Sequence, residues 1–559
     1  MHTRLDVYIN MRYICYWYMK PRPRRPLSSS LLIAAILAVT LPAQPKKPAP
    51  LPRPQILTAQ YNNARTNANL AETILTPRNV NAKQFGKLFV LPVDGDVTAQ
   101  PLYVPNLPIP GQGIHDVLFV ITAHDSIYAF DAANKPPQPL WHTALTNEQA
   151  GIHPVPSSAV QCSFLGPEVG ITSTPVIDPA TRTMYFVART ARRSPNGEDL
   201  YYQHLHAVDI TTGDEKPGSP VLLRASAPGS SFFGLLHGEV TFNAVLENQR
   251  AALLLSQGTV FIAWGSSCDE GNYFGWVMGY DARTLRQSAA WNTAPDSGES
   301  AIWQSGAGLA ADPEGNIYAA TGNGKFTASS SNGHDFGDSL VKLFLRNNTL
   351  SVRDYFTPSN EAAMNRGDND LGSTGPVLLP DQPGPHPHMA LAAGKDGKVY
   401  LIDRDHMGKY QPGSDPHAVQ AFQLNGGAYG APAYWNGHVY YCASGDFLKD
   451  FALNAGKFSA VPVHASGIRF KNPGAFPAIS ANGNTDGIVW LVVTKEYWQH
   501  DIDADLQAWD AADVSHLLYE TGTGAPGPGV ALRFTIPTIA NGRVYIASRG
   551  AVHVYGLMN

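Results

Sequence analysis

A few polar and aromatic side chains in this chain could contact a ligand, and they share a position in the sequence. Each comes just before a short stretch of small and β-favouring residues, where a loop gives way to an expected strand. Loops on a rigid scaffold usually carry binding residues. We therefore expect a ligand face made of Glu168, Trp303, Gln304, Arg366, Asp368 and Asp370, and we assign none of them a catalytic role.

Two groups of these side chains could hold a metal ion. Asp368 and Asp370 flank Asn369 and could supply the oxygen ligands that calcium prefers. The same carboxylates could instead cap turns, and we favour this because their spacing is not that of a known calcium loop. His204 and His206 alternate on one expected strand and could chelate a metal from the same side. No third ligand is identifiable, which favours structural histidines.

The chain has four cysteines. Cys162 and Cys268 fall in expected loops at one end of the fold, so they are candidates for a disulfide in an exported protein. The two loops belong to units that need not touch, and free thiols remain the alternative. Cys442 ends a strand-like run and is expected to be buried and structural.

The elements that would position these residues are clearest in residues 170–213. A first strand is expected at 171–177, a turn at 178–182, a second strand at 183–189 and a third at 203–210. Three antiparallel strands joined in this way make most of one β-propeller blade.

This unit recurs along the chain. Its third strand ends in an aromatic or aliphatic run closed by aspartate at Asp131, Asp209, Asp281, Asp403 and Asp510. Its first strand matches residues 99–103, 250–254, 305–309, 373–377, 429–433, 476–479 and 536–539, which are rich in small residues and proline. Such residues suit the crowded innermost strands of a ring. The repeats predict an all-β, eight-bladed β-propeller, with seven blades as the alternative if the unit at Tyr429 or Phe476 is incomplete.

Residues 85–93 form an expected strand with no partner before it, and the last unit, residues 535–556, supplies only three strands. We predict that residues 85–93 are the outer strand of the last blade, which closes the ring and removes its open edge.

The long insertions between second and third strands, at residues 190–202, 265–275 and 322–338, fall at one end of the blades. Turns at the other end, such as 178–182 and 312–316, are short. The end that carries the insertions, called the long-loop face below, is the predicted binding face.

Composition excludes some classes of protein. Charged residues are 15% of the chain and the net charge is −5, so no basic face is expected for a nucleic acid. The sequence contains no glycine-rich phosphate loop, no Gly-x-Ser-x-Gly motif and no zinc-protease motif.

The first residues have the pattern of a secretory signal. Basic residues precede an apolar run at 31–41 that is too short to span a membrane, and Leu41-Pro42-Ala43 offers a cleavage site. We expect a signal peptide at 1–43, with Met19 as an alternative start, a proline-rich linker at 44–54 and a single propeller at 55–559. The mature protein is expected to be periplasmic or extracellular and without a transmembrane segment.

Residues 126–131 with Trp141, and residues 205–213 with their Asp-x-x-Thr-Gly pattern, resemble the repeat of pyrroloquinoline-quinone (PQQ) propellers. The resemblance extends from about residue 85 to 556 and implies the quinoprotein alcohol dehydrogenase-like fold. The chain also resembles secreted bacterial proteins that carry this repeat. Enzymes of this family use PQQ and calcium, so the resemblance implies these two cofactors as possible ones here.

This sequence departs from those enzymes. Their cofactor lies under a disulfide of two adjacent cysteines, and no two cysteines are adjacent here. Their calcium ligands and catalytic aspartate match no motif of this chain. We therefore expect a binding or scaffold module for a small molecule or a protein, with a divergent PQQ-dependent alcohol or sugar dehydrogenase as the alternative.

Overall fold

Short antiparallel hairpins build the sheets of the protein in the computed structural model, which describes residues 53–133, 138–230, 238–494, 502–522, 524–530 and 532–558. The expected signal peptide and nearly all of the expected linker lie outside these residues. Within the described ranges, no helix combines the length and the apolar character needed to cross a membrane.

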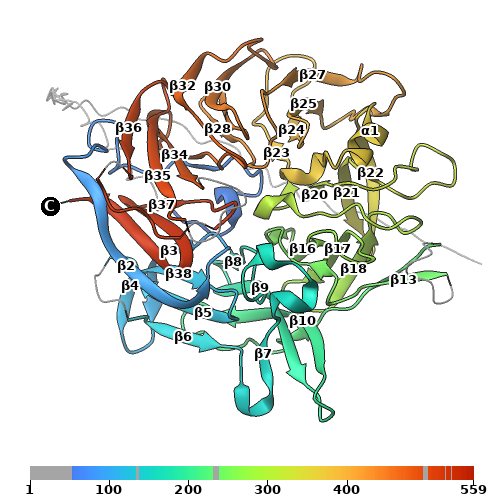
Figure 1. Cartoon of the computed structure of the whole chain (residues 1–559), viewed down its shortest axis with the longest axis horizontal. Coiled ribbons are helices and arrows are strands. Elements are labelled where there is room, and N and C mark those ends of the chain that lie inside the picture. The colour runs from blue at the N-terminus through green and yellow to red at the C-terminus, as the bar shows by residue number, and fades with distance from the viewer. Residues whose placement is uncertain are drawn as a thin grey trace, which may run out of the picture. The chain divides into compact units, whose positions relative to one another are not determined.

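Eight sheets stand round a common axis as the blades of a propeller, with the first strand of each blade nearest the axis (Figure 1). Blade 1 contains β3 (Leu102–Ile109), β4 (Gly113–Ile121), β5 (Ser126–Asp131) and β6 (Trp141–Ala144), and blade 2 contains β8 (Val176–Asp178), β9 (Thr183–Arg193), β10 (Asp199–Asp209) and β11 (Val221–Leu222). Blade 3 contains β15 (Leu254–Ser256), β16 (Thr259–Ser266), β17 (Trp276–Asp281) and β18 (Gln287–Asn292), and blade 4 contains β19 (Ala310–Ala311), β20 (Asn316–Ala320), β21 (Leu340–Arg346) and β22 (Thr349–Thr357). Blade 5 contains β23 (Val377–Leu378), β24 (Met389–Ala393), β25 (Lys398–Asp403) and β27 (Ala418–Gln423), and blade 6 contains β28 (Ala433–Trp435), β29 (His438–Cys442), β30 (Phe447–Asn454) and β32 (His464–Arg469). Blade 7 contains β33 (Ala478–Asn482), β34 (Thr485–Val493), β35 (Asp505–Asp510) and β36 (Leu517–Glu520), and blade 8 contains β37 (Thr538–Ala540), β38 (Arg543–Leu557) and β2 (Phe85–Asp96).

Smaller elements extend these blades. The added strands are β1 (Ala68–Asn69) on β33, β7 (Ile152–Pro154) on β9, β14 (Glu247–Asn248) on β16, β26 (Lys409–Tyr410) on β22 and β31 (Lys457–Phe458) on β30, while β12 (Ser226–Pro228) and β13 (Glu239–Thr241) form a separate pair. The helices within the described residues are α1 (Glu361–Arg366) and six short 3-10 turns, η1 (Ala59–Tyr61), η2 (Glu148–Ala150), η3 (Ser157–Val160), η4 (Ser163–Leu165), η5 (Gln304–Gly306) and η6 (Leu371–Ser373).

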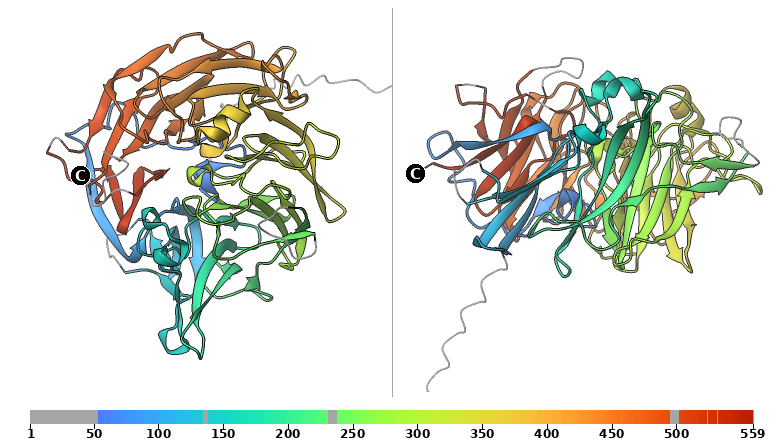
Figure 2. Two further views of the ribbon diagram at one scale, coloured as in Figure 1. Left: turned by 45° about the vertical axis from the view of Figure 1, so that its right-hand side comes forward. Right: turned by 90° about the horizontal axis from the view of Figure 1, so that it is seen from below.

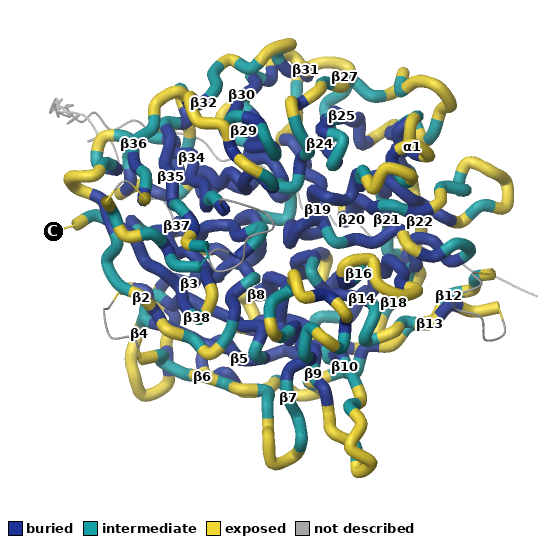
Figure 3. The backbone as a smooth tube through the Cα atoms, in the orientation of Figure 1, coloured by how far each residue is buried: buried dark blue, intermediate teal, exposed yellow. Residues whose placement is uncertain are grey.

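The apolar core lies between neighbouring blades. Tyr185 and Val187 of blade 2 pack in one cluster with Trp264 and Trp276 of blade 3. Because both faces of a blade are covered in this way, its middle strands are buried on both sides, as β16 is along nearly its whole length. Figure 3 shows buried residues concentrated in these strands and exposed residues in the peripheral loops.

The N-terminal strand closes the ring, as predicted. β2 pairs antiparallel with β38, from Phe85 opposite Leu557 to Asp96 opposite Arg549. The first residues of β38, Arg543 to Tyr545, pair with β37. Blade 8 therefore combines strands from both ends of the described chain, and the predicted count of eight blades is confirmed.

A segment before β2, here called the axial segment (residues 56–69), runs round the centre of the ring and bonds each blade in turn (Figure 2). Its main-chain and side-chain bonds, in chain order, join Ile56 to Tyr103, Leu57 to Ile177, Asn63 to Leu255 and Ala311, Ala64 to Leu378, Thr66 to Tyr434, Asn67 to Ile479 and Asn69 to Ile539. These partners lie in blades 1 to 8 in order, so the axial segment makes one circuit of the inner strands.

Two expected elements differ from the structure. The first strands are shorter than predicted, and β8 has only three residues. The stretch that leads into each first strand, here called its lead-in segment, bonds sideways to neighbouring blades, as Thr174 does to Leu253, so fewer groups remain for its own sheet. The expected loop at residues 190–202 is instead a hairpin, because β9 runs on to Arg193 and β10 begins at Asp199.

Candidate functional site

A cavity of about 370 Å³ opens on the ring's axis at the long-loop face. Each blade contributes to its wall from its lead-in segment, with Thr98, Thr172, Arg250, Trp303, Asp368, Tyr429, Asn472 and Phe534 for blades 1 to 8. A cavity that all eight lead-in segments enclose must lie on the axis. Its volume falls in the range of pockets that hold small organic molecules.

An aromatic cluster forms one side of this cavity. The ring of Phe534 lies 6.2 Å from that of Trp303 and 6.5 Å from that of Tyr429, with which it is nearly parallel at 14°. Phe476 packs against Phe534 from behind at 6.4 Å. These rings come from blades 4, 6, 7 and 8, so the wall depends on closure of the ring.

A charged network adjoins the aromatic wall. Lys395 Nζ lies 2.7 Å from Asp368 Oδ1, 2.5 Å from Asp370 Oδ2 and 5.5 Å from the Trp303 ring centre. Burial alone would lower the pKa of Lys395, but the two carboxylates raise it above its ordinary value. Burial raises the pKa of Asp370, and Lys395 offsets part of this change. One lysine therefore pairs with both aspartates, and the three groups together keep one net negative charge when all are ionised.

Arg250 enters the cavity wall from the lead-in segment of blade 3. Its Nη1 donates to the Thr172 carbonyl at 3.3 Å, and burial lowers its pKa to about 10, so it stays charged at neutral pH. Gly306 makes room for it, because a Cβ there would come within 2.2 Å of Arg250 Nη1. No carboxylate of the described residues lies within ion-pair distance of this guanidinium.

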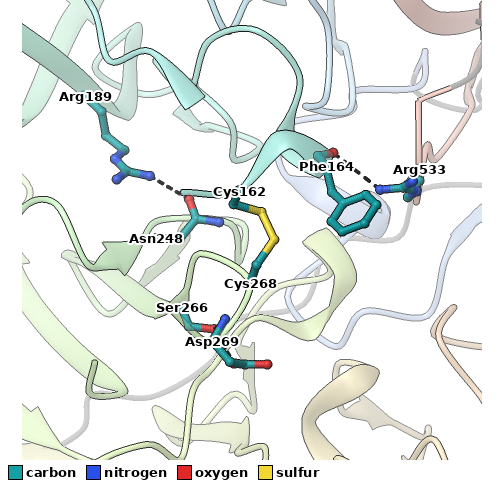
Figure 4. Close-up of a disulfide and its surroundings, with 8 residues drawn as sticks. All are labelled: Cys162, Phe164, Arg189, Asn248, Ser266, Cys268, Asp269 and Arg533. Atoms are coloured by element: carbon teal, nitrogen blue, oxygen red, sulfur yellow. Dashed lines mark hydrogen bonds between the residues drawn. A yellow bond between two sulfur atoms is a disulfide. The ribbon is translucent and has the colours of Figure 1, made fainter. Parts of the chain in front are cut away.

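A disulfide joins Cys162 to Cys268 across blades 2 and 3, with Cα atoms 5.7 Å apart (Figure 4). Cys268 lies in the cavity wall, and so do Phe164 to Gly166, which follow Cys162. Arg533 Nη1 donates to the Phe164 carbonyl at 3.4 Å, so the blade 2 loop also reaches a loop of blade 8. Cys442 is buried in β29, as expected.

Four residues of the cavity lining have a left-handed backbone. Cys268, Asp269, Asp368 and Phe534 have φ between +52° and +65°. Such a conformation costs a non-glycine residue about 1–3 kcal/mol. The backbone of these four residues is therefore held against its local preference by the surrounding structure.

The structure brings together some of the expected ligand residues. Trp303, Asp368 and Asp370 line the cavity. Gln304 is fully buried and turned toward the backbone of its own blade, and Arg366 is exposed at the end of α1. Glu168 bonds His124 Nδ1 at 2.8 Å outside the cavity lining.

The described residues do not show the ligand arrangement that either metal interpretation requires. Across the described residues, no group of three or more His, Cys, Asp or Glu side chains is arranged to hold a metal ion. His204 and His206 have ring centres 6.2 Å apart, and His206 Nδ1 is bonded to Glu215 at 2.6 Å.

Several cavity residues were not expected from the sequence: Asn248, Arg250, Lys395, Phe534 and Arg549. Arg250 could have been found, because it opens one of the matched first-strand segments. Lys395 lies in the tight turn between β24 and β25 of blade 5, and a search confined to long loops misses it.

PQQ is a flat tricarboxylate, and the resemblance implies that calcium accompanies it. The aromatic wall and Arg250 suit a flat anionic molecule, and Cys268 brings a disulfide to the wall. The carboxylates do not suit calcium, because Lys395 pairs with Asp368 and Asp370, and Arg549 lies 3.6 Å from Asp96. The residues present thus do not fit the pair of cofactors.

No known protein family's sequence profile matches this chain, and no curated protein matches it in sequence. Among solved structures, it is similar to quinohemoprotein alcohol dehydrogenase ADHIIG from Pseudomonas putida HK5, with a TM-score of 0.58 and 15% identity over 90% of this chain and 80% of that chain. A europium-containing methanol dehydrogenase gives a TM-score of 0.56 and 12% identity over 90% of this chain and 98% of that chain. At such identities the likeness shows the fold alone. The chain therefore shares its β-propeller fold with these two dehydrogenases, and its described residues form eight blades.

Proposed function

We propose that the protein is a binding module whose axial cavity takes one small organic molecule with a flat ring system at the long-loop face. The observation that carries this proposal is the aromatic wall of Trp303, Tyr429 and Phe534 in a cavity that all eight blades enclose. Offset aromatic contacts with a ligand ring would each contribute about 0.5–1.5 kcal/mol beyond burial of apolar area.

The proposal includes export to the periplasm or the cell exterior. Its support is the signal-like pattern of residues 1–43 together with the Cys162–Cys268 disulfide, since disulfides persist in oxidising compartments. The low charge content makes a nucleic-acid partner a poor fit.

Substitution of Trp303 tests the binding proposal. We expect Trp303→Ala to weaken binding of one- to three-ring aromatic probes by roughly tenfold or more, because it removes the largest ring of the wall. Calorimetric titration measures the affinity, and thermal unfolding checks the fold. Trp141→Ala, a half-buried tryptophan on the outer strand of blade 1, is the matched control and should leave affinity unchanged. Equal affinities in wild type and Trp303→Ala would reject the site.

A PQQ-dependent oxidoreductase is the second candidate. The observation in its favour is that Cys268 and Trp303 both lie in the cavity wall, so a flat cofactor could contact a disulfide and an indole. Incubation with PQQ and calcium, followed by absorbance spectra of the washed protein and dye-linked oxidation of alcohols and sugars, separates the candidates. A retained chromophore with turnover supports the oxidoreductase, whereas retention without turnover supports the binding module.

A further inference from the structure

Asn248 and Arg250 lie two residues apart where blade 3's chain approaches the axis, and both line the cavity. β14 ends at Asn248, and the chain places both side chains in the lining of the same cavity. A guanidinium fork and an amide NH₂ are both hydrogen-bond donors, so this part of the wall favours an acceptor.

The guanidinium of Arg250 has N–H donors that form no hydrogen bond with the described residues. Its one hydrogen bond in the structure goes to the Thr172 carbonyl, and within the described ranges no carboxylate is close enough to pair with it. Arg250 is partly buried, an unpaired charge in such a place is costly, and a bound anion would relieve that cost. Gly306 leaves room for the guanidinium in this position, because a Cβ there would come within 2.2 Å of Arg250 Nη1.

Asn248 is oriented from behind by a second arginine. Arg189, which is fully buried in β9, donates from Nη1 to Asn248 Oδ1 at 2.9 Å (Figure 4). Its Nη2 donates to the Val245 carbonyl at 3.0 Å. Arginine has only donors, so the oxygen of Asn248 must face Arg189. The NH₂ group of Asn248 is thereby left for the cavity.

The carboxylates of the same wall are already engaged. Asp368 and Asp370 pair with Lys395, Asp96 lies 3.6 Å from Arg549 Nε, and Asp269 accepts from Ser266 Oγ at 2.6 Å. None of these four carboxylates forms an ion pair with Arg250.

We infer that Arg250 and Asn248 form a carboxylate-binding subsite of the axial cavity, with Arg189 as its positioning residue. The ligand is then an aromatic carboxylic acid, with its ring on the wall of Trp303 and its carboxylate on the two donors. This inference rests on the proposed function and names the class of ligand.

Paired probes test the subsite. Benzoate, 2-naphthoate and anthracene-2-carboxylate are each titrated against the matching carboxamide, which keeps the ring and removes the charge. We expect at least one acid to bind about tenfold more tightly than its amide. Arg250→Met should weaken the acid by about 10- to 100-fold and leave the amide nearly unchanged, since hydrogen bonds to charged groups are the stronger ones.

Two further variants separate positioning from folding. Asn248→Asp keeps an acceptor for Arg189 but places an oxygen toward the cavity, so it should also remove the preference for the acid. Arg189→Met should reduce the ratio of acid to amide affinity, which a merely structural role would not change. Arg283→Met, at an exposed turn, is the control and should keep that ratio.

The outcomes distinguish the inference from the proposed function. Acids and amides that bind equally well, both dependent on Trp303, would overturn the carboxylate subsite and retain the binding module. An acid preference that survives both Arg250→Met and Asn248→Asp would also overturn the subsite. Failure of every probe to bind the folded protein at millimolar concentration would overturn both.

Discussion

Asp338 shows how one buried carboxyl group ties stability to pH. It is fully buried, its Oδ1 accepts from the Leu371 amide at 2.9 Å, and its Oδ2 has no partner among the described residues. Burial raises its pKa from 3.8 to about 8. The folded state therefore holds a proton that the unfolded state releases near pH 4. This group makes the free energy of unfolding fall as the pH rises from about 4 to about 8.

Asp338→Asn should remove this dependence. Asparagine cannot titrate, can still accept from Leu371, and tolerates the φ of +44° at this position. We expect the fall in the free energy of unfolding between pH 5 and pH 8 to be shallower by up to about 1.4 kcal/mol per pH unit. Urea unfolding at several pH values measures it. Identical slopes in the two proteins would mean that Asp338 ionises normally.

At the residue scale, the sequence predicted part of the site. Trp303, Asp368 and Asp370 were expected because they precede first strands, and position in the repeat placed them on the axis. The same rule included Gln304 and Arg366, whose side chains turn away. Position in a repeat gives the place of the backbone, whereas the direction of a side chain depends on contacts with other blades, as Arg189 shows for Asn248.

The axial segment is the element that the sequence did not reveal. Its centre is Arg65, which is fully buried and donates to Thr58 Oγ1 and to the carbonyls of Ala59, Leu253 and Leu309. These partners join the axial segment to blades 3 and 4. Burial lowers the pKa of Arg65 to about 9, and its charge is balanced by oxygen dipoles rather than by a carboxylate.

Arg65→Met should destabilise the whole ring. It leaves several buried oxygens without donors, at a cost of about 1–3 kcal/mol for each unsatisfied group, so we expect a loss of at least about 3 kcal/mol in the free energy of unfolding. Denaturant unfolding measures the loss. Arg78→Met, an exposed arginine with 87% of its side chain accessible, is the control and should change stability by less than about 0.5 kcal/mol. A similar small change for Arg65→Met would show that the axial segment does not hold the blades together.

Local pattern explains why the hairpins were predictable and the axial segment was not. Strands such as β9 and β17 are continuous β-favouring runs that end at turn residues. The axial segment has no regular pattern, because its residues bond different blades that lie far away in the sequence, as Asn69 bonds Ile539. The first strands were predicted to be too long for a similar reason, because their lead-in segments bond neighbouring blades and not their own sheet.

Closure of the ring is the property of the whole molecule on which the cavity depends. Leu91 in β2 is buried and pairs with Val552, while its neighbour Val90 is 38% exposed. Leu91→Ala should destabilise the protein by about 2–5 kcal/mol, and Val90→Ala by less than about 0.5 kcal/mol, as expected for a buried and a surface position of one strand.

Thermal and denaturant unfolding compare the two variants, and probe binding is measured in parallel. Blade 8 supplies Phe534 to the aromatic wall, so partial opening of the ring in Leu91→Ala should also weaken aromatic probes. Rapid amide hydrogen exchange in β2 of Leu91→Ala would show that the ring has opened. If that protein still bound the probes with full affinity, the cavity would not depend on closure of the ring.

The repeats therefore predicted the propeller, its eight blades and the closing strand, because these follow from periodicity and topology. They did not predict the ligand, because the cavity's chemistry comes from single residues of eight different units.

A crystal structure of the protein soaked with 2-naphthoate tests the central claim most directly. The account predicts density for one molecule in the axial cavity, with its rings against Trp303 and Phe534 and its carboxylate within hydrogen-bond distance of Arg250 and Asn248. Density for the acid only on the outer edges of the blades, with the axial cavity closed by the protein's own side chains, would contradict it.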